Sequence, residues 1–124
     1  MARPKQPGLT ENELSVMKVL WEEAPLKIGE ILERLKRHPK PAYTSLLTLV
    51  QAMERKGYIA HEQDGKAYSY SPKLLERNFT SSEIKRVAKR LFNDSPFALA
   101  MNLVKDEHLS QEEIKQLRQL LEGE

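Results

Sequence analysis

Short hydroxyl side chains gather near the start of a helix predicted for residues 42–56. Thr44, Ser45 and Thr48 lie within about one turn of each other, away from the apolar stripe of this helix. Short polar side chains let a helix approach base edges in the DNA major groove, and nearby phosphate contacts hold its register. We therefore interpret this helix as a DNA-recognition helix. Its candidate DNA-contacting residues are Tyr43, Thr44, Ser45, Leu47, Thr48, Gln51, Arg55 and Lys56.

For two residues of this helix, Leu47 and Tyr43, packing within the protein is the alternative to contact with DNA. Leu47 is spaced away from the stripe of Leu46, Leu49, Val50 and Met53. It could contact thymine methyl groups, or it could pack on a neighbouring element. Tyr43, at the helix start, could place its hydroxyl on a phosphate or could serve as a packed aromatic cap. Arg55 and Lys56 are expected to contact phosphates.

Three cations outside this helix are further candidates for contacts with DNA. Lys66 lies in the turn of a predicted hairpin, from which it could reach the phosphate backbone or an adjacent minor groove. A merely solvated lysine is the alternative. Arg3 and Lys5 belong to residues 1–8, which we interpret as a flexible basic arm. For this arm the alternative is a disordered tail without a role in binding.

The elements that must position these residues follow one another as helix, short strand, helix, helix and hairpin. The predicted segments are a helix at 9–23 with the capping box Thr10–Glu13, an extended piece at 26–28, a helix at 29–37, a break at 38–41 and the helix at 42–56, ended by Gly57. Strand-like segments at 58–63 and 67–71 flank Asp64-Gly65-Lys66, a strong hairpin signal. This order predicts a winged helix-turn-helix domain over residues 9–72.

Residues 73–124 are predicted to be helical throughout. Helices are expected at 81–92, capped by Ser81 or Ser82, from Ser95-Pro96 onward, and from the capping box at Ser110 onward. Their apolar stripes exceed what one small winged helix can cover, so we interpret the segment as a dimerisation tail. The alternative is that it packs on its own domain. The candidate dimer-core residues are Leu91, Phe92, Phe97, Leu99, Leu103, Ile114, Leu117 and Leu121.

The composition excludes several other classes of protein. The chain has no cysteine, which excludes disulfides and thiolate metal sites. His38, His61 and His108 are far apart and outside any metalloprotease spacing, so we predict neither an enzyme nor a cofactor or metal. The apolar runs are too short to span or bind a membrane, and no signal peptide is recognisable, which makes a soluble, cytoplasmic protein the default expectation.

The charge distribution points to a polyanion more clearly than the net charge of +2 does. Residues 34–56 hold six basic side chains against one acidic one, whereas residues 78–124 hold seven basic against eight acidic. A basic middle beside a near-neutral tail suits a nucleic-acid-binding element joined to another part. A solvated helix face is the alternative.

Nearly the whole chain resembles the penicillinase-repressor family of winged-helix regulators (BlaI/MecI type). The segments that carry the resemblance are Leu9–Leu14, Val16–Met17, Leu20–Trp21, Ala42–Ser45, Leu47–Leu49, Lys56–Ile59, Ala67–Tyr70 and Leu109–Ile114. The resemblance implies a homodimeric repressor, linked to antibiotic resistance, on a palindromic operator. It also implies base contacts at Thr44, Ser45, Leu47 and Thr48, where this sequence lacks the lysine or arginine with which some relatives read guanine.

The resemblance further implies induction by a membrane-bound sensor metalloprotease. In the best-known relatives, a membrane sensor-protease senses a β-lactam, and the repressor is then cut at an Asn-Phe bond in the tail. Here Asn102-Leu103 occupies that place, so the asparagine matches and the phenylalanine does not. Copper sensing through tail cysteines, known in another branch, is excluded. A winged helix that binds another protein instead of DNA is the rival hypothesis for the whole chain.

Overall fold

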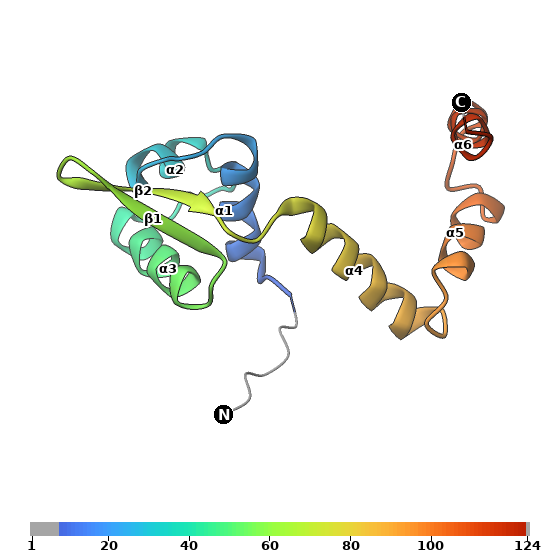
Figure 1. Cartoon of the computed structure of the whole chain (residues 1–124), viewed down its shortest axis with the longest axis horizontal. Coiled ribbons are helices and arrows are strands. Elements are labelled where there is room, and N and C mark those ends of the chain that lie inside the picture. The colour runs from blue at the N-terminus through green and yellow to red at the C-terminus, as the bar shows by residue number, and fades with distance from the viewer. Residues whose placement is uncertain (1–7, 124) are drawn as a thin grey trace. The chain divides into compact units, whose positions relative to one another are not determined.

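The computed structural model describes residues 8–123, in which six helices accompany a two-stranded antiparallel sheet (Figure 1). The elements are α1 (Glu11–Glu22), α2 (Ile28–Arg34), α3 (Tyr43–Arg55), β1 (Ile59–Asp64), β2 (Ala67–Pro72), α4 (Glu76–Leu91), α5 (Pro96–Lys105) and α6 (Gln111–Leu121). The chain forms two compact units that divide between Phe79 and Thr80, within α4. The predicted fold class, mainly helical with one hairpin, is confirmed.

The first unit owes its core to the apolar stripes of α1, α2 and α3, which converge with the start of the hairpin. Met17, Ile31 and Val50, one from each helix, are fully buried. The core is completed by Val16, Val19, Leu20, Leu26, Ile28, Leu35, Leu46, Met53, Tyr58, Ile59 and Tyr70. Because this cluster lies wholly between residues 16 and 70, the unit has a core of its own.

The hairpin that follows α3 forms the wing, with a register running from Ile59 opposite Pro72 to Asp64 opposite Ala67. Only Gly65 and Lys66 remain for the turn, and Gly65 takes a φ of +67°, which a side chain would disfavour. Leu26 adds a bridge to β2, since its N–H donates to the Tyr70 carbonyl at 3.0 Å and its carbonyl accepts from the Tyr70 N–H at 2.8 Å. The extended segment predicted before α2 is therefore confirmed at Leu26.

Two helix boundaries differ from the predicted ones by three residues or more, and packing explains both. The helix expected to reach residue 37 ends at Arg34, because Leu35 turns extended and is buried in the core. The helix expected to begin at Ser81 or Ser82 begins at Glu76 instead. Its first turns carry Phe79, whose ring lies 5.8 Å from that of Trp21. Tertiary packing thus overrides the capping tendency of the two serines.

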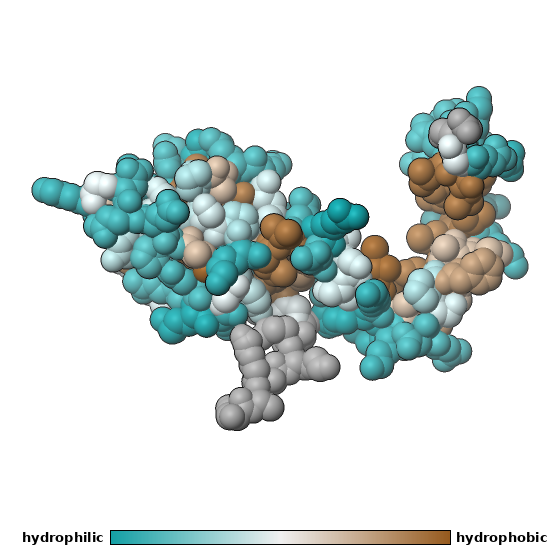
Figure 2. All heavy atoms as spheres, viewed as in Figure 1, coloured by the Kyte–Doolittle hydropathy of each residue, from teal (hydrophilic) through white to brown (hydrophobic). Residues whose placement is uncertain are grey.

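The second unit begins in α4 and continues through α5 and α6, whose predicted caps are confirmed. Ser95 accepts a hydrogen bond from the Ala98 N–H ahead of Pro96, and Ser110 forms a capping box with Glu113. Large apolar side chains nevertheless remain in contact with solvent, as the brown surface over α5 and α6 shows (Figure 2). Phe97 is 73% exposed and Leu121 is 84% exposed. None of the helices within residues 8–123 is long and apolar enough to cross a membrane.

Candidate nucleic-acid interface

Helix α3 presents two faces of opposite character. Leu46, Val50 and Met53 are buried on one face and fix the helix to the core. The other face is exposed, and its members are the predicted DNA contacts Tyr43, Thr44, Ser45, Thr48, Gln51 and Arg55. An exposed row of short polar side chains on a helix anchored from behind is the arrangement that groove entry requires.

The structure shows how accessible Leu47 and Tyr43, the two residues of α3 with alternative roles, are to a ligand. Leu47 is half-buried and packs against the core cluster, so only part of its side chain is available for a thymine methyl group. Its spacing predicted an outward direction, and packing against the core cluster covers part of it. Tyr43 is 52% exposed, which leaves much of its ring accessible at the start of the helix.

A tight turn at Gly57 ends helix α3 and leads the chain into the wing. Gly57 adopts a φ of +88°, and its N–H donates to the Glu54 carbonyl at 3.0 Å. The Tyr58 N–H donates to the Met53 carbonyl at 3.1 Å, which completes a Schellman motif. Tyr58 is buried, so this turn both terminates α3 and anchors the start of β1.

A second contact joins the wing to the same end of α3. His61 on β1 places Nδ1 2.6 Å from Glu54 Oε2, and its ring stacks on Tyr68 at 4.0 Å. Lys66 is exposed at the tip of the wing, and its contact with the phosphate backbone of DNA stays a prediction. Sequence reasoning missed the role of His61, because Glu54 lies on another element and no local pattern joins the two. Arg3 and Lys5 lie outside the described residues.

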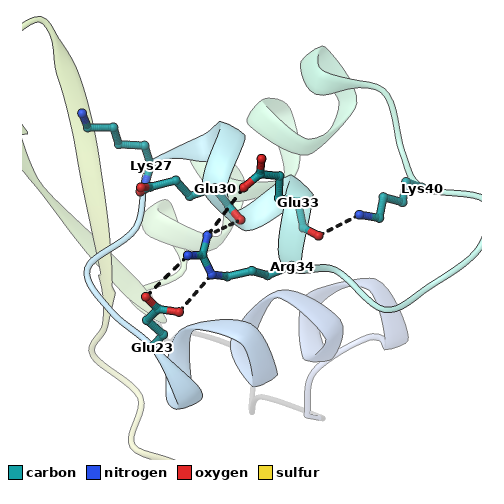
Figure 3. A network of polar contacts seen from close by, with 6 residues as sticks. All are labelled: Glu23, Lys27, Glu30, Glu33, Arg34 and Lys40. Atoms are coloured by element: carbon teal, nitrogen blue, oxygen red, sulfur yellow. Dashed lines mark hydrogen bonds and ion pairs between the residues drawn. The ribbon is translucent and has the colours of Figure 1, made fainter.

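Three of the six basic residues between 34 and 56 form hydrogen bonds or ion pairs with other residues of the domain. Arg34 forms a fork with Glu23, at 2.9 Å from Nε to Oε1, and also donates to the Glu30 carbonyl at 3.1 Å (Figure 3). Lys40 Nζ donates to the Glu33 carbonyl at 2.8 Å and so caps the end of α2 (Figure 3). These exposed pairs stabilise the domain only weakly. The charge count therefore includes side chains that already have partners within the domain.

Lys56 is the third of these residues, and it has a partner within the domain that the sequence did not predict. Its Nζ donates to Glu13 Oε2 at 2.7 Å, and the Glu13 side chain is only 4% exposed. Burial opposes ionisation of Glu13, but hydrogen bonds from Lys56 and from the Thr10 backbone prevail and lower its pKa. The hydrogen bond and the charge of Glu13 raise the pKa of Lys56. Local patterns could not reveal this pair, since its partners are 43 residues apart.

The lowered pKa of Glu13 predicts a loss of stability in acid. Because the pKa of Glu13 in the folded state lies below the ordinary value of 4.5, the Glu13–Lys56 pair stabilises the fold fully above pH 4.5. The stabilisation disappears as the pH falls through the folded-state pKa. Urea unfolding monitored by circular dichroism, from neutral pH downward, is expected to show this decline in the wild type. The Glu13→Gln variant should be less stable at neutral pH and lose less on acidification; an equally steep decline would contradict the assignment.

Three helices followed by a hairpin, with the third helix exposed on one face, define the winged-helix class. Residues 9–123 match the family model described as penicillinase repressor, and the chain therefore belongs to the penicillinase repressor family. This confirms the resemblance found in the sequence, and membership in a repressor family confirms that the chain is not an enzyme.

One relative matches nearly the whole chain, and two solved structures match 60% of it. The penicillinase repressor of Bacillus licheniformis is 30% identical over 95% of this chain and 92% of its own length. The solution structure of the DNA-binding domain of the repressor BlaI matches with a TM-score of 0.52 and 25% identity, over 60% of this chain and 92% of that domain. Monomeric B. licheniformis BlaI in complex with the blaP half-operator matches over the same shares, with a TM-score of 0.50 and 25% identity.

Proposed function

We propose that the chain is a dimeric, sequence-specific transcriptional repressor that binds a palindromic operator. The observation that carries the proposal is the exposed short-polar face of α3, anchored by Leu46, Val50 and Met53 in a member of a repressor family. One winged helix enters the major groove of each half-site. The solved complex of a relative with a half-operator supports this mode of binding.

The residues of the interface divide into two roles. Thr44, Ser45 and Thr48 read base edges, with Gln51 further along the groove and the free part of Leu47 against a thymine methyl group. Phosphate contacts come from Tyr43, Arg55 and Lys66, joined by Arg3 and Lys5 of the arm. Lys56 is left out of this set because it is bound to Glu13.

The exposed apolar side chains of the second unit support dimerisation. Phe97, Leu117 and Leu121 would all be costly to leave in water, and a second copy offers them burial. The dimer couples two weak half-site contacts, so the second becomes intramolecular. Leu91, Phe92, Leu99, Leu103 and Ile114 complete the expected interface.

Selection from a pool of random duplex DNA at near-physiological salt tests the proposal. We expect the full-length protein to enrich a palindrome whose half-sites are about one helical turn apart. Weak, salt-sensitive binding without enrichment would contradict it and would favour a winged helix that binds another protein. The enriched duplex, called the selected operator below, then serves every other binding measurement.

Induction by proteolysis is proposed at the Asn102-Leu103 bond. This bond lies inside α5, where Asn102 Nδ2 donates to Asp106 Oδ2 at 2.9 Å. A protease needs its substrate extended, so a membrane-bound sensor metalloprotease can cut only when α5 opens locally. Cleavage would separate α6 from the rest of the chain and weaken the dimer.

Cleavage is therefore expected to depend on both the sequence and the stability of α5. With the cognate protease, Asn102→Ala should be cut far more slowly than wild type. Ser95→Ala, which removes the cap of α5 at a cost of about 1 kcal/mol, should be cut up to roughly fivefold faster. Gel electrophoresis and mass spectrometry of the fragments measure both rates. Normal cutting of Asn102→Ala would contradict cleavage at this bond.

A further inference from the structure

One carboxylate joins the beginning of α1 to the end of α3. Glu13 Oε1 accepts the Thr10 N–H at 2.9 Å, and Thr10 Oγ1 accepts the Glu13 N–H at 3.1 Å, which closes the capping box of α1. The other oxygen, Oε2, accepts from Lys56 Nζ at 2.7 Å. Both oxygens are thus engaged, each by a different helix.

The location of this pair suits both partners electrostatically. Glu13 lies in the first turn of α1, where the helix dipole favours a negative charge. Lys56 is the C-cap of α3, where the dipole favours a positive charge. The Glu13 side chain is buried, so removing Lys56 would leave a carboxylate without its ionic partner in a largely dry site.

The end of α3 is consequently held from two sides. Glu13 binds it to α1, whose Val16 and Met17 are fully buried in the core. Glu54, two residues before Lys56, binds it to the wing through His61. The exposed threonines and serine lie nearer the other end of α3, so a small tilt at the held end would displace them from base edges.

We infer that Glu13 and Lys56 are positioning residues, which set the placement of α3 for sequence-specific DNA contact. This inference rests on the proposed function. Lys56 acts through Glu13 and not through a phosphate. Recognition of a DNA sequence by short polar side chains depends on the placement of α3, whereas attraction to any duplex depends on charge alone.

The test compares two variants that remove the same charge from the same turn of α1. Glu13→Gln and Glu11→Gln each remove one negative charge, and Glu11 is exposed. Charge alone would raise the affinity of both for DNA. We expect Glu13→Gln to lower affinity for the selected operator roughly tenfold, the size of a mismatched base pair, without lowering affinity for a scrambled duplex. Glu11→Gln should not lower operator affinity.

The Lys56→Gln variant provides the second part of the test. We expect it to lower operator affinity by a similar factor, and the double variant with Glu13→Gln to bind no more weakly than either single one, because both break the same contact. A phosphate contact would instead make the two effects additive and reduce the slope of log affinity against log salt by about 0.9. That result would overturn the inference.

Two other outcomes would also overturn it, and they are distinguishable from failure of the proposed function. If Glu13→Gln binds the operator as tightly as Glu11→Gln, Glu13 does not position α3. If Glu13→Gln weakens operator and scrambled duplex equally, the pair only keeps the domain folded. A wild-type protein that prefers no duplex overturns the proposed function, and the positioning role with it.

Discussion

A chain cut after Phe79 is expected to stay folded but to bind the selected operator about 10²–10⁴-fold more weakly than the full-length protein. The core lies wholly between residues 16 and 70, so the fragment keeps it. The fragment lacks the exposed apolar residues of α5 and α6 that we assign to the dimer. Each half-site would then be bound independently. Fluorescence anisotropy with whole and half operators measures the difference.

The position of the cut decides whether this experiment is interpretable. Trp21 Nε1 donates to the Leu74 carbonyl at 2.8 Å, and its ring packs on Phe79. A chain cut after Pro72 would lose both contacts, so weak binding could reflect a damaged domain. The two fragments therefore serve as a matched pair, with circular dichroism as the control for folding. A fragment ending at Phe79 that binds as tightly as full-length protein would show that the tail does not supply avidity.

Ser45→Asp is expected to abolish operator recognition while leaving the fold intact. Ser45 is exposed in the first turn of α3, where the helix dipole favours a carboxylate. The same carboxylate would face bases and phosphates in the groove, and like-charge contact costs several kcal/mol, or roughly a hundredfold or more in affinity. Thermal unfolding and anisotropy measure the two properties separately.

Two control variants isolate the position of the charge in this experiment. Ser45→Ala should cost much less, since it only removes a hydroxyl group. Gln116→Glu makes the same change in net charge on α6 and should bind nearly as wild type does. Near-normal operator binding by Ser45→Asp would mean that this face of α3 does not enter the groove.

Elements with local signals could be predicted from the sequence. Gly57 marked the end of α3, Ser95-Pro96 marked the start of α5, and the Thr10 and Ser110 capping boxes were found where expected. These signals act within one helical turn, so they survive in any tertiary context. The exposed polar face of α3 follows from the same periodicity.

Features that depend on contacts between distant segments could not be predicted in this way. The start of α4 is set by Phe79 against Trp21, and the end of α2 by the burial of Leu35. The pairing of Lys56 with Glu13 was not predicted, because the carboxylate belongs to another helix. Leu47 is half-buried against the core cluster, and spacing alone does not show how much of a side chain its neighbours cover. In each case a long-range partner changed the outcome.

The internal pairing of Arg34, Lys40 and Lys56 has a consequence for how many repressor molecules a cell would need. A genome presents about 10⁶–10⁹ competing sites, and a repressor is titrated by them in proportion to its affinity for any phosphate backbone. A cation that must first leave Glu23, the Glu33 carbonyl or Glu13 contributes somewhat less to that affinity. We expect a somewhat larger share of the molecules to remain available to the operator, so that fewer of them are needed to keep it occupied.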